Sequence, residues 1–386
     1  MKQISTAVRT LMMVLLLTFA AVPAMAASEE PIEETTIQPG TSAQLRYATG
    51  FSIDYLEDGI KRLIDGEGRE VILVPREIET IPAEFEGKQI VRTPVERVMY
   101  SSNPMVGMLM LLDEDWVLDS ICAVTTKESI WTFDEIVERM QNGQIAYVGN
   151  NSNGDPDYEQ VQEINPELVF VRTGAYAQTT FIEKLEELGI PYVVDNGNEE
   201  QHYLGRKECV RFSAAFYNLD QKALDIMNQA EKDMEELREK LADVTVEDSP
   251  SLVWCSPYNG MMSMTEADSW EGSMMQEVKA NNLFADIYTG NNKLTIEEVY
   301  ARAYDADLMI YGSTPNYTAN KKEMLENVPQ FEDLKLVQDG NIWQIAKSFY
   351  QSNHMTDVMA KDLAAILYPD LFPDYEPTYF IKMADE

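Results

Sequence analysis

The stretch DQKALDIMNQAEKDMEELREKLA, residues 220–242, decides the fold of this chain. Its apolar residues recur at helical spacing on one face: Ala223, Met227, Ala230, Met234, Leu237 and Leu241. Asp220 stands where a helix cap is expected, and Glu and Lys fill the opposite face. A helix over residues 221–242 would span about 33 Å, roughly the diameter of a domain. The sequence therefore predicts one long helix with a structured half on each side.

Both halves show short apolar runs that alternate with helical patterns. Before the long helix we expect strands at 95–100, 145–148, 168–171 and 191–194, and helices at 105–112, from 157 onward, at 181–188 and at 204–218. After it we expect strands at 252–255, 308–311 and 342–345, and a closing helix at 355–367. Alternating strands and helices are typical of α/β lobes with mostly parallel sheets.

The remaining segments lie at the N-terminal end. Residues 27–43 are rich in Glu, Pro and Thr and are typical of a flexible leader, and the Asp65-Gly66-Glu67-Gly68 turn predicts a β-hairpin. We therefore divide the chain into a signal peptide (1–26), a leader with hairpin and connector (27–90), an N-terminal lobe (91–205), linking helices (206–245) and a C-terminal lobe (246–386).

The first 26 residues have the pattern of a secretory signal. Lys2 and Arg9 precede an uncharged apolar run, Leu11 to Val22, and the small residues Ala24 and Ala26 flank a cleavage site. An uncleaved anchor is the alternative. No cysteine lies near the cut for lipid attachment, and no later run reaches the length of a membrane span. We expect a periplasmic protein.

The net charge and the small numbers of cysteine and histidine exclude several classes of partner and of metal or disulfide module. The chain of 386 residues has 30 Lys and Arg against 66 Asp and Glu, a formal net charge of −36. Such a surface repels phosphate backbones and anionic head groups, so nucleic acid is excluded as a partner. Three cysteines without a CxxC motif and two histidines exclude a disulfide scaffold, a cysteine-rich zinc module and a histidine cage.

The two halves contain a weak internal repeat. Asp157 and Thr295 each stand at the start of an expected helix, with Glu159 and Glu297 two residues further on. Each helix leads to an acid and a strand, Glu167 before 168–170 and Asp307 before 308–310. The copies lie 297 − 159 = 138 residues apart. Capped helix starts are common, so the repeat supports two similar lobes without proving them.

In order and spacing these features resemble the substrate-binding proteins of ABC importers for iron chelates and cobalamin, between about Ile64 and Met383. The matching stretches are DGEGREV (65–71), VERV (95–98), Glu159 through INPELV (164–169), KLEELGIP (184–191) and LGR (204–206). The long leader and the long 116–148 segment depart from the family pattern. The resemblance implies two Rossmann-like lobes with mostly parallel sheets, joined by one long α-helix.

It also implies a monomer that captures an iron chelate, siderophore or haem-like, in the cleft between the lobes, with cobalamin or another metal chelate as the alternative. No intrinsic cofactor is expected. The ligand site is expected in loops at the carboxyl ends of the strands. In the N-terminal lobe these loops contain Tyr100, Ser101, Ser102, Asn103, Asn150, Asn151, Arg172, Thr173 and Tyr176. In the C-terminal lobe they contain Tyr258, Asn259, Met261, Met262, Ser313, Phe349, Tyr350 and His354.

Three observations bear on the ligand. Arg172 could pair with an anionic chelate or form a surface salt bridge. His354 could ligate iron or cobalt, with Tyr350 as a comparable candidate, although a lone histidine is more often a satisfied polar group. Five methionines within 15 residues, at 261, 262, 264, 274 and 275, suit either a soft metal or an apolar patch, and no second cluster supports the metal.

The resemblance gives Glu159 and Glu297 a second role, because in relatives one exposed Glu per lobe docks onto the ABC permease that works with its ATPase. Compensation of the helix dipole is the alternative. A secreted enzyme with a carboxylate-based site is the rival from another class. No GxSxG, HExxH, Walker or GxGxxG motif supports it, so we expect a binding protein and not an enzyme.

Overall fold

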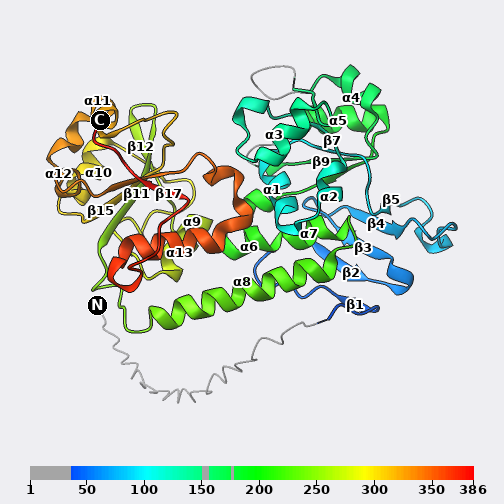
Figure 1. The fold of residues 1–386 in the computed structure, drawn as a ribbon, viewed down its shortest axis with the longest axis horizontal. Coiled ribbons are helices and arrows are strands. Elements are labelled where there is room, and N and C mark those ends of the chain that lie inside the picture. The colour runs from blue at the N-terminus through cyan, green and yellow to red at the C-terminus, as the bar shows by residue number, and fades with distance from the viewer. Residues whose placement is uncertain (1–35, 150–155, 175–177) are drawn as a thin grey trace, which may run out of the picture. The chain divides into compact units, whose positions relative to one another are not determined.

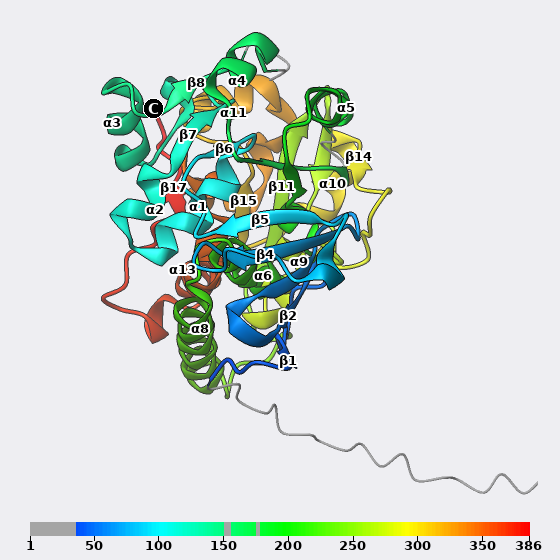
Figure 2. The ribbon, with the colours of Figure 1, turned by 90° about the vertical axis from the view of Figure 1, so that its right-hand side faces the viewer.

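The computed structural model describes residues 36–149, 156–174 and 178–386, which belong to one compact unit. They form three β-sheets with helices packed around them (Figures 1 and 2). The expected signal segment lies outside the described residues. Within those residues, no helix has the length and apolar character needed to cross a membrane.

A five-stranded sheet precedes the N-terminal lobe. Its strands are β1 (Thr41–Ser42), β2 (Ser52–Tyr55), β3 (Lys61–Ile64), β4 (Glu70–Pro75) and β5 (Gln89–Thr93), in the order β1-β2-β3-β4-β5. The expected hairpin is confirmed as β3 and β4, and its turn is fixed because Asp65 accepts hydrogen bonds from the backbone N–H of Glu67 and Arg69, both at 3.0 Å. The expected connector was incomplete: it contains β5, which pairs with β4 in parallel.

The N-terminal lobe contains a parallel sheet in the order β10-β9-β6-β7-β8. Its strands are β6 (Val98–Tyr100), β7 (Ile121–Val124), β8 (Ala146–Tyr147), β9 (Leu168–Val171) and β10 (Tyr192–Val194). Its helices are α1 (Asn103–Leu112), α2 (Asp115–Asp119), α3 (Asp134–Gln141), α4 (Tyr158–Ile164) and α5 (Thr179–Leu188). The apolar strand β9 is buried along its whole length, as expected for a parallel strand covered on both faces.

The C-terminal lobe contains a mixed sheet in the order β14-β12-β11-β15-β16-β17, with β13 beside β11. Its strands are β11 (Ser251–Tyr258), β12 (Met261–Met264), β13 (Asn281–Asn282), β14 (Lys293–Leu294), β15 (Leu308–Tyr311), β16 (Ile342–Ile345) and β17 (Phe380–Lys382). Its helices are α9 (Trp270–Glu277), α10 (Ile296–Ala303), α11 (Lys321–Asn327), α12 (Lys335–Gln338) and α13 (Thr356–Leu367). The central strands β11, β15 and β16 are parallel.

Three helices lie between the two lobes in sequence: α6 (Tyr203–Glu208), α7 (Val210–Ala215) and α8 (Asp220–Lys240). The helix expected over 204–218 is therefore divided in two near Cys209. The long helix is confirmed, and its apolar face reaches both lobes (Figure 1). Ala223 and Met227 belong to the core of the N-terminal half, and Met234 and Leu237 to a core of the C-terminal lobe. One continuous helix therefore contributes side chains to both cores.

The expected repeat is visible in the backbone contacts. Asp157 caps α4, and Thr295 forms a capping box at α10. Glu167 accepts a hydrogen bond from the backbone N–H of Arg97, and Asp307 accepts one from that of Ser251. Each acid thus holds the beginning of the neighbouring central strand in its own lobe.

Residues 46–50 form a strap, defined here as the segment whose backbone N–H groups bind two buried carboxylates. Glu208 accepts from residues 46, 47 and 48, and Glu200 accepts from residues 49 and 50, at 2.7–3.1 Å. Both glutamates are under 5% exposed, 2% for Glu208 and 4% for Glu200. The strap therefore ties the N-terminal sheet to the linking segment.

Candidate functional site

The candidate site consists of loops that follow the central parallel strands. In the N-terminal lobe they are residues 101–103 after β6, 125–127 after β7, and 172–174 with Gln178 after β9. In the C-terminal lobe they are 257–260, which comprise the end of β11 and its turn into β12, 312–320 after β15 and 346–354 after β16. Parallel strands place such loops along one edge of each sheet, where α/β proteins bind ligands.

Gln178 holds two loops of the N-terminal lobe together. Its side-chain oxygen accepts hydrogen bonds from Ser101 Oγ at 2.6 Å and from the backbone N–H of Arg172 at 3.2 Å. Thr125 Oγ1 donates to the Ser101 carbonyl at 2.9 Å and adds the third loop. Ser101 and Ser102 are buried and Asn103 is half-buried. Thr173 is half-buried, and its backbone N–H donates a hydrogen bond to Asn196 Oδ1 at 2.9 Å.

Several residues expected to contact ligand are inaccessible. Tyr100, Met262 and Phe349 are at most 1% exposed and belong to hydrophobic cores. The hydroxyl of Tyr100 bonds to that of Tyr217 at 3.1 Å. A ligand could reach these three side chains only after a local opening, so they serve packing in this conformation. Asn150, Asn151 and Tyr176 lie outside the described residues.

The loops of the C-terminal lobe present exposed aromatic rings. Tyr258 is 51% exposed and Tyr350 is 53% exposed, and Asn259 beside Tyr258 is also exposed. Tyr317, which no sequence motif indicated, is 81% exposed in the loop after β15. The expected single loop over 258–262 is wrong, because Met261 begins β12 and is half-buried. Ser313 is buried, and its hydroxyl lies 3.0 Å from that of Thr318.

These loops contain almost no acid, in a chain with 66 Asp and Glu. Residues 101–103, 125–127, 172–174, 257–260, 312–320 and 346–354 contain no Asp or Glu, but they contain Lys127, Arg172 and Lys347. At the opposite ends of the C-terminal strands, acids occur at positions 247, 248, 305, 307 and 339. The loop after the edge strand β10 does contain acids, although burial raises the pKa of Asp195 to about 6. Apart from Glu128, which directly follows 125–127, these loops at the carboxyl ends of the central strands therefore contain cations and no acidic side chain.

His354 lies at the contact between the lobes rather than at a free surface. It is 6% exposed, and its ring packs edge-on against Phe133 with centroids 5.7 Å apart. Burial, together with the nearby Lys207 ammonium, lowers the pKa of His354 to about 3. Lys207 Nζ bonds to the His354 carbonyl at 2.9 Å and pairs with Asp357 at 3.0 Å. The imidazole is therefore neutral near pH 7, and its expected role as a metal ligand stays a prediction that this burial disfavours.

A second side chain of the same loop joins the lobes directly. Gln351 Oε1 accepts hydrogen bonds from the backbone N–H and the hydroxyl of Thr132, both at 3.2 Å, and Gln351 Nε2 donates to the Ile130 carbonyl at 2.8 Å. Among the described residues, no hydrogen bond or ion pair joins loop 257–260 or loop 312–320 to the N-terminal lobe. The lobes are thus fastened at the 346–354 loop, and the other two C-terminal loops stay available to a ligand.

The described residues give little support to a resident metal. Over residues 36–149, 156–174 and 178–386, no group of three or more His, Cys, Asp or Glu could hold an ion. Four of the five clustered methionines, at 262, 264, 274 and 275, are at most 2% exposed in hydrophobic cores. The apolar alternative is therefore correct for the methionine cluster.

Glu159 and Glu297 are both exposed at the second position of their helices. The caps are supplied by other residues, Asp157 at α4 and Thr295 with Glu298 at α10. Neither Glu159 nor Glu297 forms an ion pair within the described part of the chain. Both carboxylates are therefore free to meet a partner.

Comparison with known proteins assigns the class. A family model described as "Periplasmic binding protein" matches residues 105–348, more than half of the chain. An uncharacterized lipoprotein of Methanocaldococcus jannaschii is 27% identical over 363 residues, which cover 88% of this chain and 85% of that protein. A second uncharacterized lipoprotein of that organism is 26% identical over 364 residues, which cover 92% of this chain and 90% of that protein.

Solved structures share the fold at low identity. The molybdate-bound molybdate periplasmic binding protein MolA of Haemophilus influenzae has a TM-score of 0.59 at 16% identity and covers 82% of this chain and 93% of its own. Helicobacter pylori CeuE with Ni(II) bound has a TM-score of 0.55 at 13% identity, and the match covers 76% of this chain and 90% of CeuE.

The chain belongs to the periplasmic binding protein family, in the class whose two α/β lobes are connected by a long helix. Membership of this family makes the chain a binding protein of a kind that acts outside the cytoplasm. The expectation of a binding protein rather than an enzyme is confirmed by this family.

Proposed function

We propose that this protein captures an iron chelate, siderophore or haem-like, between the loops 257–260, 312–320 and 346–354 of one lobe and the loops 101–103, 125–127 and 172–174 of the other. It then delivers the chelate to an ABC permease, onto which Glu159 and Glu297 dock. The observation that carries the ligand class is the composition of these loops, which combine exposed tyrosines with Lys and Arg and contain no acid.

The charge and the exposed aromatic rings of these loops favour an anionic, aromatic ligand. A chain with a net charge of −36 repels anions over most of its surface. A site that lacks acids and contains Arg172, Lys127 and Lys347 is the place where an anionic complex meets least repulsion. Tyr258 ends β11, and Tyr317 and Tyr350 lie in the loops after the adjacent parallel strands β15 and β16. Their exposed rings offer faces and hydroxyls to a planar or catechol-like ligand.

The proposal includes the location of the protein. Residues 1–26 carry the export pattern, and no cysteine lies near the proposed cut. Lipid attachment through a cysteine at that cut is therefore unavailable to this chain, although two similar proteins are named lipoproteins. We propose a periplasmic protein that is released from its signal segment.

Binding can be measured by thermal shift and by tryptophan fluorescence on the chain that begins at Ala27. Trp131 lies beside the 346–354 loop, and Trp254 and Trp270 pack against Phe349. Ferric tris-catecholate or haem at a hundredfold excess over its Kd should stabilise the protein by about 2.7 kcal/mol. If neither ligand shifts the melting temperature and cobalamin does, the corrinoid alternative replaces the iron chelate. If none of the three ligands shifts the melting temperature, the proposed ligand class is wrong.

A further inference from the structure

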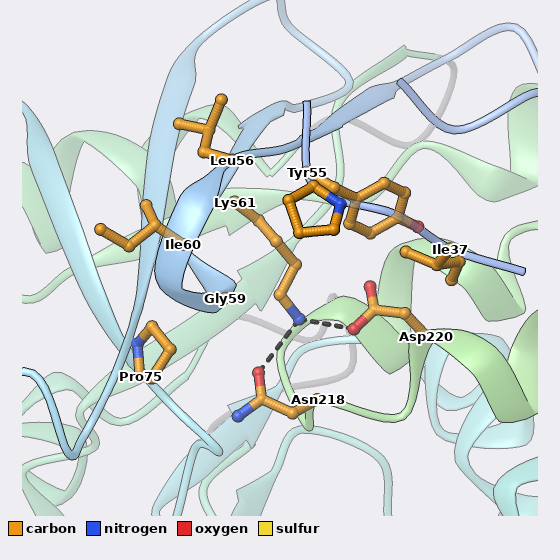
Figure 3. A pocket seen from close by; sticks show the side chains of 10 residues that line it. Ile37, Tyr55, Leu56, Gly59, Ile60, Lys61, Pro75, Asn218 and Asp220 are labelled. Carbon is orange, nitrogen blue, oxygen red and sulfur yellow. Dashed lines mark hydrogen bonds and ion pairs between the residues drawn. The ribbon is translucent and has the colours of Figure 1, made fainter. Parts of the chain in front are cut away.

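A pocket far from the loops of the candidate site lies where the N-terminal sheet meets the beginning of α8 (Figure 3). Its volume is about 270 Å³, near the lower end for small-molecule sites. The walls are largely apolar and come from the first described residues, from the turn between β2 and β3 and from the end of β4. They comprise Ile37, Pro39, Tyr55, Leu56, Ile60 and Pro75.

The polar floor of this pocket is almost fully satisfied. Lys61 is 4% exposed, and its ammonium group donates to the Ala215 carbonyl at 2.6 Å, to Asn218 Oδ1 at 3.0 Å and to Asp220 Oδ2 at 2.6 Å. Three donors meet three acceptors, so the lysine has no proton left for a ligand. Its charge is balanced by Asp220, and a charged ligand would find no counter-ion here.

One polar atom at this floor has no partner. Asp220 Oδ1 makes no hydrogen bond and has almost no accessible surface, so a ligand in the pocket reaches it after a small local shift of the side chains around it. In Figure 3 this oxygen points away from Lys61, toward Ile37 and Tyr55. A buried acceptor without a donor costs about 1–3 kcal/mol, and a donor supplied by a ligand recovers part of that cost. An ammonium ligand would be repelled by Lys61, and a carboxylate would be repelled by Asp220. A neutral hydroxyl meets neither penalty.

We propose that this pocket is a second small-molecule site, which takes a neutral, single-ring or similarly sized apolar molecule that donates one hydrogen bond to Asp220 Oδ1. The occupant would contact both the N-terminal sheet and the first turn of α8. The site is independent of the chelate proposed above and of its loops.

Methyl NMR on the chain that begins at Ala27 tests the site with four probes of one size: phenol, toluene, benzylamine and benzoate. The methyl groups of Ile37, Leu56 and Ile60 report occupancy. Phenol should bind about tenfold more tightly than toluene, as expected for one hydrogen bond to a charged acceptor. Benzylamine and benzoate should bind more weakly than phenol. Equal binding of phenol and toluene, preference for either ion, or no shift at millimolar phenol would overturn the proposal.

Two variants separate the pocket from the hydrogen bond. Leu56→Trp fills the cavity and should abolish the phenol shifts at Ile37 and Ile60, whereas Ile381→Trp places the same ring on exposed β17 and should leave them unchanged. Lys61→Met with Asp220→Leu replaces the buried ion pair by apolar side chains of a kind that cores tolerate. Its phenol-to-toluene preference should fall to about one while binding persists. A preference that survives this change rejects Asp220 as the acceptor.

The N-terminal leader supplies the remaining control. A chain shortened to begin at Thr36 should bind phenol as the longer chain does. If binding appears only after the shortening, the leader itself is the occupant, and the proposal of a small-molecule site is wrong.

Discussion

Gly107 of α1 lies directly against His354, and a Cβ atom at Gly107 would stand 2.7 Å from His354 Nδ1 and 2.7 Å from the Gln351 carbonyl. Gly107 belongs to the N-terminal lobe and His354 to the C-terminal lobe, and both are buried. The absence of a side chain at position 107 therefore sets how closely the two lobes approach. The backbone carbonyl cannot move as a flexible side chain can, so the contact does not tolerate a methyl group.

We predict that Gly107→Ala destabilises the protein. In an unobstructed helix this substitution stabilises by about 1 kcal/mol, whereas overpacking costs about 1–3 kcal/mol. Here the overpacking dominates because the clash is with backbone. Urea unfolding of the wild type and the variant measures the difference in the free energy of unfolding. A Gly107→Ala variant more stable than the wild type would show that the lobes can move apart at this contact without loss of stability.

The neutral state of His354 predicts a pH dependence of stability. The pKa of His354 is about 3 in the folded protein and about 6.5 in an unfolded chain. Between these values the unfolded chain binds a proton that the folded protein does not, so the free energy of unfolding falls as the pH falls below 6.5. From pH 7.5 to pH 5 the wild type should lose about 2 kcal/mol more than His354→Gln. Every other ionisable group is common to the two proteins, so the comparison isolates His354, and an equal loss in the two proteins would contradict the prediction.

The docking role of Glu159 and Glu297 predicts a defect in transport without a defect in binding. Glu159→Arg combined with Glu297→Arg should abolish uptake by cells and leave ligand affinity unchanged, because both carboxylates are exposed and neither caps its helix. Glu163→Arg with Asp305→Arg changes the net charge equally at exposed positions near the same helices. Uptake at the normal rate in the first pair, or an equal loss in both pairs, would remove the docking role.

The charge of the site predicts that Lys347 contributes to affinity for an anion. Lys347→Gln should weaken the binding of ferric tris-catecholate about three- to fivefold, the effect of an exposed ion pair worth about 0.7–1 kcal/mol. Lys322→Gln removes the same charge from the exposed helix α11 of the same lobe. Titration calorimetry of ferric tris-catecholate with both variants separates a contact at the site from the effect of the overall protein charge. Equal affinities of the two variants would place the ligand elsewhere.

The long helix predicts a small motion between the lobes. Its two halves pack into different cores, and Gln351 fastens the lobes across their contact. Closure must therefore bend α8 or break those bonds, and solution scattering should show little contraction when ligand binds. A contraction as large as that of proteins hinged by extended strands would contradict this.

The elements with strong periodicity were predictable from the sequence. The long helix, the strands 168–171 and 308–311 and the paired helix starts at Asp157 and Thr295 appear at the expected positions. Their signals are local, because apolar spacing and capping residues act within one turn or one strand. The β11–β12 hairpin also had a local signal that was overlooked: Asn259-Gly260 adopts positive φ at both positions, as tight hairpin turns require.

The failures concern contacts between distant residues. Nothing near His354 in the sequence shows that Gly107 covers it, and the burial of Tyr100 depends on Tyr217. The strand β5 lies in a segment with few apolar residues and exists because β4 offers a free edge. Strand order places most of the loops, although Met261 and Met262 belong to β12 rather than to a loop. Which side chains the loops expose depends on packing that no short pattern encodes.

The strap has a consequence for how the polypeptide matures. Residues 46–50 are made early by the ribosome, yet the carboxylates that hold them, Glu200 and Glu208, are made about 150 residues later. Until that distant segment emerges, five backbone donors near the beginning of the chain have no partner. This delay keeps the newly synthesised N-terminal region from completing its native contacts, which suits a polypeptide that must cross a membrane before it folds.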